Sequence, residues 1–266
     1  MVRLSADVDP SVVDALRAAG CVFAEEEAAV LTAEARTRGH LELMLARREA
    51  GEPLEQIVGW AEFCGIRMVV APGVFVPRRR TELLVREAVA LVTATRPAHD
   101  GPVVLDMCCG CGAIGAALAA ALGTVELHAV DIDPAAAACA KRNVAAARGR
   151  VYEGDLYAPL PASLRGRVDV LVANAPYVPT GAIATMPPEA RLHERPAALD
   201  GGADGLDVQR RIIAAAPEWL APGGHVLIET SERQAPTAVD ALARNGLNPR
   251  VARSAEADAT VVIGHV

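Results

Sequence analysis

Short apolar runs alternate with alanine-rich helical stretches through the second half of the chain. The runs are VVLDM, ELHAVDID, RVYEGD, VDVLVANAP, GGHVLIET, NPRVAR and ATVVIGHV, and the helical stretches include AIGAALAAAL and PAAAACAKRNVAAA. Apolar runs without polar alternation are typical of parallel strands that are covered on both faces by crossover helices. No helical stretch separates the last two runs, so they predict an antiparallel pair at one edge. The pattern therefore predicts an α/β fold with a Rossmann-like, seven-stranded sheet.

The first part of the chain follows a helical period instead. Its short apolar clusters are separated by Gly20 and Gly39, which predicts several small helices. Two β-rich runs then flank residues 71–73 in FCGIRMVVAPGVFVP, and they predict a hairpin with its turn there. Residues 97–101 mark the seam before the sheet. We expect a small helical domain at 1–62, a hairpin and connecting helix at 63–92, and the α/β domain at 93–266.

Composition narrows the classes of protein that fit. No apolar run in the 266 residues approaches the roughly 18 residues that span a bilayer, and the N-terminal stretch carries acids, so we expect a cytoplasmic protein without a membrane segment. Six cysteines, three of them at 108, 109 and 111, do not resemble a disulfide framework and fit a reducing compartment. A net charge of −7 and an aromatic content of 3% argue against stable, charge-driven nucleic-acid binding.

A glycine-rich loop follows the first strand of the predicted sheet. Gly110, Gly112 and Gly115 spell G-x-G-x-x-G, and Asp131 closes the next strand at the spacing of a ribose-binding acid. Alone, these residues suggest a dinucleotide site. Asp106 counts against it, because a carboxylate that ends the first strand would repel a pyrophosphate. A ligand with a nucleoside, a sulfonium and an ammonium group would be attracted instead, which points to S-adenosylmethionine.

The acids at the strand ends have predicted roles in that site. Gly110 and Gly112 would let the backbone approach the ligand closely, and Asp131 would accept hydrogen bonds from two ribose hydroxyls. Asp133, which precedes Pro134, is the better candidate for a helix cap. Asp155 ends the third strand, where it would meet the adenine amino group. The alternatives are that Asp106 and Asp131 cap helices or loops and that Asp155 is a solvated loop acid.

The cysteine cluster is open to three interpretations. A zinc site needs a second ligand pair, and none is visible near Cys108, Cys109 and Cys111, so we predict no metal. The three residues would then be small side chains in the loop. Their closeness to a helix N-terminus would lower the pKa of a thiol, which makes oxidation sensitivity a further hypothesis.

The fourth strand ends in the tetrapeptide Asn174-Ala175-Pro176-Tyr177. An amide nitrogen is a poor nucleophile, so a site that methylates one must restrain it. The side-chain carbonyl of Asn174 and the backbone carbonyl of Ala175 would each accept one N–H of the acceptor. Pro176 stiffens the turn, and Tyr177 offers a flat face to a planar group. The alternative is an ordinary strand-to-loop turn.

At this point the chain resembles a known family, the HemK-type protein-glutamine N5-methyltransferases within the class I S-adenosylmethionine-dependent enzymes. The likeness runs from about residue 51 to about residue 245 and rests on GEPLEQIVGWAEFCGIRMVVAPGVFVPR, VLDMCCGCGAIG, AVDIDP, GDLY, NAPY and ERPAALDGGADGLDVQRRIIAAAPEWLAPGGHVLIE. It implies a helical substrate-recognition domain, glutamine nitrogen as acceptor, S-adenosylhomocysteine as product and a peptide-chain release factor as protein partner. It also implies that Cys108, Ile132, Leu156 and Asn174 belong to the cofactor site and that Arg78 contacts substrate. A monomer is expected.

The departures from the family pattern keep alternatives open. The family usually reads N-P-P-Y and D-L-G-T-G-S-G, so Ala175 replaces a proline and Cys108 replaces a glycine. Arg79 and Arg80 stand where the family has Pro and Glu, and the segment before residue 51 is short for the family. One alternative is an N-methyltransferase for a nucleic-acid base or a small planar amine. The other is a non-catalytic relative whose cofactor pocket has decayed.

Overall fold

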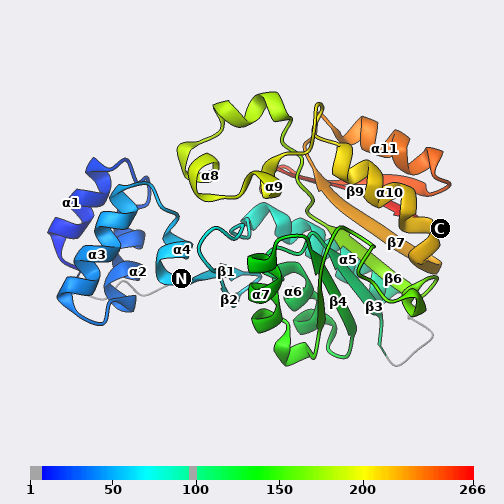
Figure 1. Cartoon of the computed structure of the whole chain (residues 1–266), viewed down its shortest axis with the longest axis horizontal. Coiled ribbons are helices and arrows are strands. Elements are labelled where there is room, and N and C mark those ends of the chain that lie inside the picture. Colours follow the sequence, from blue (N-terminus) through cyan, green and yellow to red (C-terminus); the bar gives the residue numbers. More distant parts are fainter. Residues whose placement is uncertain (1–7, 96–100) are drawn as a thin grey trace.

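The computed structural model describes residues 8–95 and 101–266. Figure 1 shows a group of small helices at the N-terminal side, joined through a two-stranded hairpin to a larger body built around a sheet. The N-terminal helices are α1 Pro10–Ala18, α2 Ala24–Glu34, α3 Arg38–Glu49 and α4 Leu54–Val58. They enclose their own core around Leu16, Leu31 and Met44, each at most 2% exposed. The helical N-terminal domain expected from the sequence is therefore present.

One predicted helix break is wrong. Gly39 lies inside the first turn of α3 and does not separate two helices. The break comes at Ala35, which is extended, and Thr37 then caps α3 by accepting a hydrogen bond from the backbone N–H of His40. A threonine oxygen satisfies one of the unpaired N–H groups at a helix start, whereas a single glycine within a helix is tolerated.

The hairpin is also placed differently from the prediction. Its strands are β1 Trp60–Phe63 and β2 Ile66–Val69, and its turn is Cys64-Gly65, not residues 71–73. Both turn residues have positive φ, 49° and 71°, which matches the two-residue turns that join twisted antiparallel strands. Residues 74–76 form no strand. Val74 and Val76 are nevertheless buried, which explains their β-like pattern.

The main sheet has seven strands, as predicted. They are β3 Val103–Met107, β4 Glu126–Asp131, β5 Arg150–Glu153, β6 Val168–Ala173, β7 Leu220–Thr230, β8 Asn248–Ser254 and β9 Ala259–His265. Their order is β5-β4-β3-β6-β7-β9-β8. The first five in this order run parallel, and β9 pairs antiparallel with both β7 and β8, which confirms the antiparallel edge.

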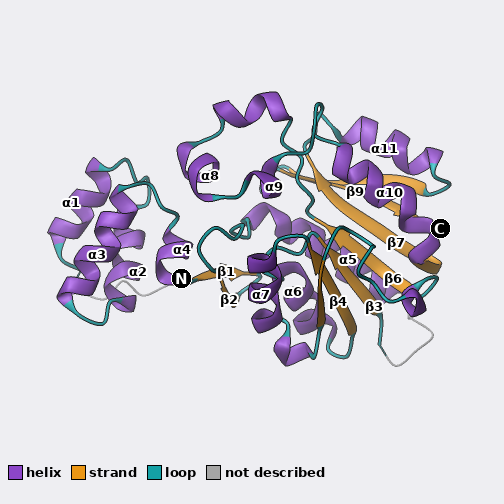
Figure 2. Ribbon diagram, in the orientation of Figure 1, coloured by secondary structure: helices purple, strands orange, loops and turns teal. Residues whose placement is uncertain are grey.

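Helices cover both faces of this sheet (Figure 2). They are α5 Glu82–Thr95, α6 Ala113–Leu122, α7 Pro134–Asn143, α10 Asp207–Trp219 and α11 Ala235–Arg244, with short turns η1 Arg79–Thr81, η2 Ala145–Ala147 and η3 Ala162–Leu164. Alternate residues of each central strand face opposite cores: Val104 and Val170 pack with α5 and α6, while Leu105 and Leu171 pack with α10. Of the predicted seam, residues 97–100 lie outside the described part of the chain.

A long segment that the sequence did not predict connects β6 to α10. Residues 180–199, called the strap below, contain η4 Thr180–Thr185, α8 Pro188–His193 and α9 Pro196–Leu199. Figure 1 shows α8 and α9 between the N-terminal helices and the main sheet. Gln56 of α4 contacts the strap: its amide nitrogen donates a hydrogen bond to the carbonyl of His193 at 3.4 Å. Within residues 8–95 and 101–266, no helix combines the length and apolar character needed to cross a bilayer.

Candidate active site

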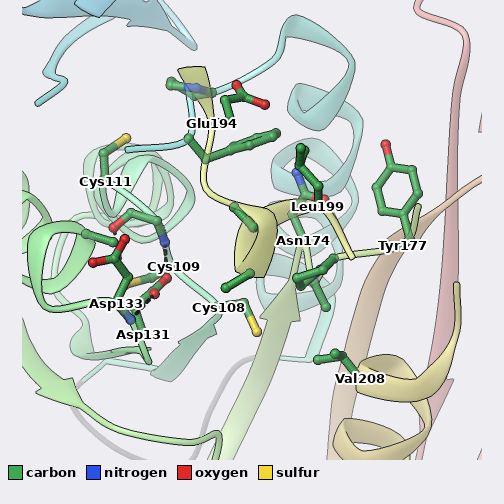
Figure 3. A pocket seen from close by; sticks show the side chains of 18 of the residues that line it. Cys108, Cys109, Cys111, Asp131, Asp133, Asn174, Tyr177, Glu194, Leu199 and Val208 are labelled. Atoms are coloured by element: carbon green, nitrogen blue, oxygen red, sulfur yellow. Dashed lines mark hydrogen bonds between the residues drawn. The ribbon is translucent and has the colours of Figure 1, made fainter. Parts of the chain in front are cut away.

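A cavity of about 750 Å³ lies at the carboxyl ends of β3, β4 and β6. A doubly wound sheet leaves a crevice there, beside the switch in strand order, and here the switch falls between β3 and β6. Residues 73–81 and the strap line the remaining sides. In Figure 3, Cys108 lies between Asp131 on one side and Asn174 and Tyr177 on the other. The cavity therefore brings the predicted cofactor residues and the predicted tetrapeptide together.

Asp131 organises the cofactor half of the cavity. One carboxylate oxygen accepts the backbone N–H of Gly110 at 2.7 Å, and the other accepts that of Asp133 at 2.9 Å. Each carboxylate oxygen keeps a second lone pair, so the side chain can still accept two hydroxyl groups. Burial raises the pKa of Asp131, and the two backbone N–H groups oppose that shift. Asp133 caps α7 through the N–H of Ala135, as predicted.

The loop after β3 forms a cradle for a ligand. A Cβ atom added at Gly110 would meet no atom within 4 Å, so it would project into open space that a closely bound molecule could fill. Cys108, also at the cavity, has a φ of 56°, in the left-handed region that glycine adopts most easily. This backbone conformation explains why the family pattern has a glycine at this position.

The part of the cofactor half lined by Ile132, Leu156 and Asp155 is mainly apolar and contains one ion pair. Ile132 lines the cavity and is 58% exposed, so it offers apolar surface to a ligand. Leu156 lines the same region and is buried. Asp155 also lines it, but its carboxylate is paired with Arg211 at 2.6 Å. A ligand amino group at Asp155 would therefore share that carboxylate with a guanidinium.

Two residues predicted for the cofactor site lie behind it. Asp106 and Gly112 are not among the described residues that line the cavity. Asp106 is fully buried and accepts the backbone N–H of Gly115 at 2.8 Å, while its other oxygen has no partner among the described residues. Burial raises the pKa of Asp106 to about 7. A Cβ at Gly112 would approach Ala140 to 3.0 Å, so this glycine allows α6 to pack on α7.

The cysteines are not activated thiols. Burial raises the pKa of Cys108, Cys109 and Cys111. The nearby carboxylates of Asp106 and Asp131 add to the shift at Cys108 and Cys109, and that of Asp106 adds to it at Cys111. The expectation of a lowered thiol pKa is therefore wrong, because burial outweighs the adjacent helix N-terminus. All six cysteines are free, and no group of three potential metal ligands occurs in the described ranges.

The tetrapeptide forms the other half of the cavity. Asn174, Ala175, Pro176 and Tyr177 all line it, directly after β6. The amide nitrogen of Asn174 donates to the hydroxyl oxygen of Thr81 at 3.3 Å. Ala175 is 1% exposed, so the missing proline ring leaves no exposed gap. The Tyr177 hydroxyl donates to Glu229 at 3.4 Å, and burial raises the pKa of Tyr177 to about 12, so it stays protonated at neutral pH.

Two buried glutamates hold the arginines of this half. Arg78 lines the cavity and pairs with Glu194 of the strap, whose side chain is 1% exposed. Arg80 pairs with Glu229 at the end of β7, at 3.4 Å, and lies over the ring of Tyr177. Both positive charges are therefore compensated within the site. A free basic surface, as a nucleic acid would require, is not formed by these two residues.

Sequence reasoning missed Thr81, Glu194 and Glu229. The signal for Glu229 was present, because HVLIET places a lone carboxylate near the end of an otherwise apolar strand, as VVLDM does for Asp106. Glu194 lies in the run ERPAALDGG, which carries no local periodicity that would place it in a cavity. Thr81 directly follows Arg79 and Arg80, which depart from the family pattern, but its own side chain carries no signal that would place it in the site.

Comparisons with known proteins agree with this arrangement. The family profile described as methyltransferase small domain matches residues 66–199. A release factor glutamine methyltransferase from Geobacter sulfurreducens is 42% identical over 205 residues, which are 76% of this chain and 69% of that protein. A 4-amino-L-phenylalanine/4-methylamino-L-phenylalanine methyltransferase from Streptomyces pristinaespiralis is 39% identical over 189 residues, 71% of this chain and 64% of that protein. A solved methyltransferase from Pyrococcus furiosus, 16% identical, covers 83% of this chain and 98% of its own with a TM-score of 0.55, which shows the fold.

Proposed function

The chain belongs to the HemK-type family of S-adenosylmethionine-dependent protein-glutamine N5-methyltransferases, and we propose that it methylates the side-chain amide nitrogen of a glutamine in a peptide-chain release factor. The observation that carries the proposal is the placement of Asn174 and Tyr177 in the same cavity as Asp131 and Gly110. One half of the cavity suits the cofactor, and the other suits a planar amide.

The cofactor half fits S-adenosylmethionine, which supplies an electrophilic methyl group on a sulfonium. Asp131 would accept the ribose hydroxyls, because each of its oxygens keeps a lone pair beyond the backbone N–H that it accepts. Ile132 would pack against the adenine, and the open space at Gly110 would admit the methionine part. Asp106 would lie behind the loop without a direct contact to the ligand, and because burial raises its pKa to about 7 it would carry only part of a negative charge at neutral pH.

The acceptor half would restrain the glutamine amide. Its nitrogen is a weak nucleophile, so its orientation toward the methyl group decides the rate. Asn174 Oδ1 and the Ala175 carbonyl would each accept one N–H, and the ring of Tyr177 would lie against the amide plane. No general base is required before the transfer, because the nitrogen becomes acidic once it is methylated. Water and competing groups would be excluded by the strap and residues 73–81, which line the cavity.

A methyl-transfer assay tests this function. We expect label from S-adenosylmethionine to appear in an intact release factor and to map to one glutamine. Asn174→Ala should lower the rate by about 100-fold or more, while calorimetry shows that the cofactor still binds. If calorimetry shows cofactor binding and no labelled release factor forms, the proposed acceptor is wrong. If no cofactor binds, the chain is a non-catalytic member of the family.

A small planar amine is the second candidate acceptor. The observation that favours it is the 39% identity to the enzyme that methylates 4-amino-L-phenylalanine. Free 4-amino-L-phenylalanine in the same assay distinguishes the candidates, since the release factor should outcompete it if the first proposal holds. A nucleic-acid base is less favoured, because Arg78 and Arg80 already pair with Glu194 and Glu229.

The state in which the enzyme works follows from this proposal. Because a release factor acts in translation, we infer that the enzyme works in the cytoplasm. We also infer that it is a monomer and that it does not bind nucleic acid stably. Light scattering should give the mass of one 27.7 kDa chain. Retention on RNA or DNA that salt abolishes would contradict the last inference.

A further inference from the structure

Two adjacent residues of the strap bond to different halves of the cavity. Glu194 pairs with Arg78 in the acceptor half and accepts the backbone N–H of Val76 at 3.5 Å. Arg195 contacts the cofactor half instead, because its Nη1 donates to Oδ1 of Asp133 at 2.9 Å. Asp133 is the cap residue at the start of α7. The strap therefore joins the two halves through neighbouring side chains.

The Arg195 side chain lies at the rim of the cavity, not inside it. Asp133 and Gly73 both line the cavity, and a Cβ atom added at Gly73 would lie 3.9 Å from Nε of Arg195. Arg195 itself is not among the described residues that line the cavity, and its side chain is 53% exposed. The guanidinium is therefore on the outer edge, where the strap, Gly73 and the start of α7 meet.

Asp133 connects this contact to the predicted ribose-binding carboxylate. Its backbone N–H donates to Oδ1 of Asp131 at 2.9 Å. Its side-chain Oδ1 accepts the N–H of Ala135 at 2.8 Å as well as the guanidinium of Arg195. Figure 3 shows Asp133 directly beside Asp131. The residue that holds one oxygen of Asp131 in place is therefore also the residue to which the strap is bonded.

We propose that Arg195 is a positioning residue, which closes the strap over the cofactor half through its ion pair with Asp133 and so slows release of the bound S-adenosyl compound. This inference rests on the proposed function, because it requires that ligand in the cofactor half. A nucleoside bound at Asp131 lies next to Asp133, so breaking the ion pair frees the strap at the edge nearest to the ligand. An exposed ion pair is weak, so this contact can break in every catalytic cycle.

The rate at which S-adenosylhomocysteine dissociates tests the proposal, measured by displacement of radiolabelled ligand. This ligand has no net charge at neutral pH, so long-range attraction does not obscure the result. Arg195→Gln should raise the dissociation rate constant about two- to fivefold, as expected for loss of an exposed ion pair. Arg195→Lys keeps the positive charge and should recover most of the change. Arg191→Gln, at another exposed arginine of the strap, is the matched control with the wild-type rate.

A charge test at both positions separates the ion pair from other effects of the arginine side chain. Asp133→Asn removes the charge and keeps the cap of α7, because asparagine caps helices about as well as aspartate. Arg195→Glu should release the ligand faster than Arg195→Gln, since the introduced carboxylate faces Asp133. With Asp133→Asn in both proteins, that difference should disappear. A dissociation rate constant equal in Arg195→Gln and wild type, or a difference unaffected by Asp133→Asn, would overturn the proposal.

This readout needs no methyl acceptor, so it separates the inference from the proposed function. If S-adenosylhomocysteine binds and all the rate constants are equal, the inference about Arg195 is wrong and the proposed function stands. If the ligand binds to none of the proteins, both are wrong. A release factor that stays unlabelled while the expected rate changes are observed would refute the proposed acceptor and support the role of Arg195.

Discussion

Cys108 shows how one residue departs from its family without changing the fold. Its φ of 56° suits glycine, and its side chain lines the cavity where the methionine part of the cofactor would lie. We expect Cys108→Gly to tighten S-adenosylmethionine binding by about threefold, or ~0.6 kcal/mol, because the side chain is removed from that space. Isothermal titration calorimetry of both proteins measures this change in the dissociation constant.

The control for this prediction has the same backbone conformation. Cys64 has a φ of 49° in the hairpin turn and does not line the cavity among the described residues. Cys64→Gly should relieve similar strain and leave the cofactor dissociation constant unchanged. Equal tightening in both variants would show that backbone strain, not the position of the thiol, controls affinity.

Asp106 makes stability depend on pH in a definite direction. Its pKa rises from the usual 3.8 to about 7 in the folded protein, so the folded state holds this proton more tightly than the unfolded chain does. Its stabilising contribution is therefore complete at low pH and is lost as the pH rises to about 7. Asp106→Asn lacks this titration. The free energy of unfolding of the variant minus that of the wild type should increase between pH 4 and 7 and then level off.

Urea unfolding without cofactor at a series of pH values makes that comparison. Asp240→Asn, at an exposed position on α11, provides the surface control. A difference that is constant for Asp106→Asn would mean that Asp106 is ionised throughout this range.

At the scale of elements, Gln56 joins three segments. Its amide nitrogen donates to the carbonyls of Val74 at 3.1 Å and His193 at 3.4 Å, and its oxygen accepts the N–H of Gly73 at 3.0 Å. Gln56→Ala should lower the free energy of unfolding by about 1–3 kcal/mol, because buried backbone groups lose their partners. Glu55→Ala, the preceding and more exposed residue of α4, should change it much less. Chemical denaturation measures both, and equal losses would contradict the role of Gln56.

The elements that the sequence predicted are those with a long, regular pattern. The seven strands and the antiparallel edge follow from apolar runs and their spacing, and the structure confirms them. The strap was missed because its helices are only six and four residues long and its many prolines read as loop. The hairpin turn was misplaced because Pro72-Gly73 is a strong turn signal. Cys64-Gly65 is a weaker signal in the sequence, and its role as the turn is seen in the positive φ of both residues.

At the scale of the whole molecule, the sequence predicted the strand ends that form the floor of the cavity, but not the other segments that line it. Asp131, Gly110, Asn174 and Tyr177 follow strands whose carboxyl ends must meet, so topology alone brings them together. Glu194 reaches the cavity from the strap, and Thr81 from the turn before α5. Contacts of this kind join distant parts of the chain, and no local pattern encodes them. The resemblance of the ERPAALDGG run to the family was the available indication that the strap belongs to the site.

The hydrogen bond from Gln56 to the carbonyl of His193 matters when this protein is truncated. Residue 56 precedes the hairpin, so a chain begun at β1 would retain every strand and every helix around the sheet. It would nevertheless lack one anchor of the wall that carries Glu194. Part of the wall of the cavity is thus held by a residue that lies outside the range 66–199 matched by the family profile.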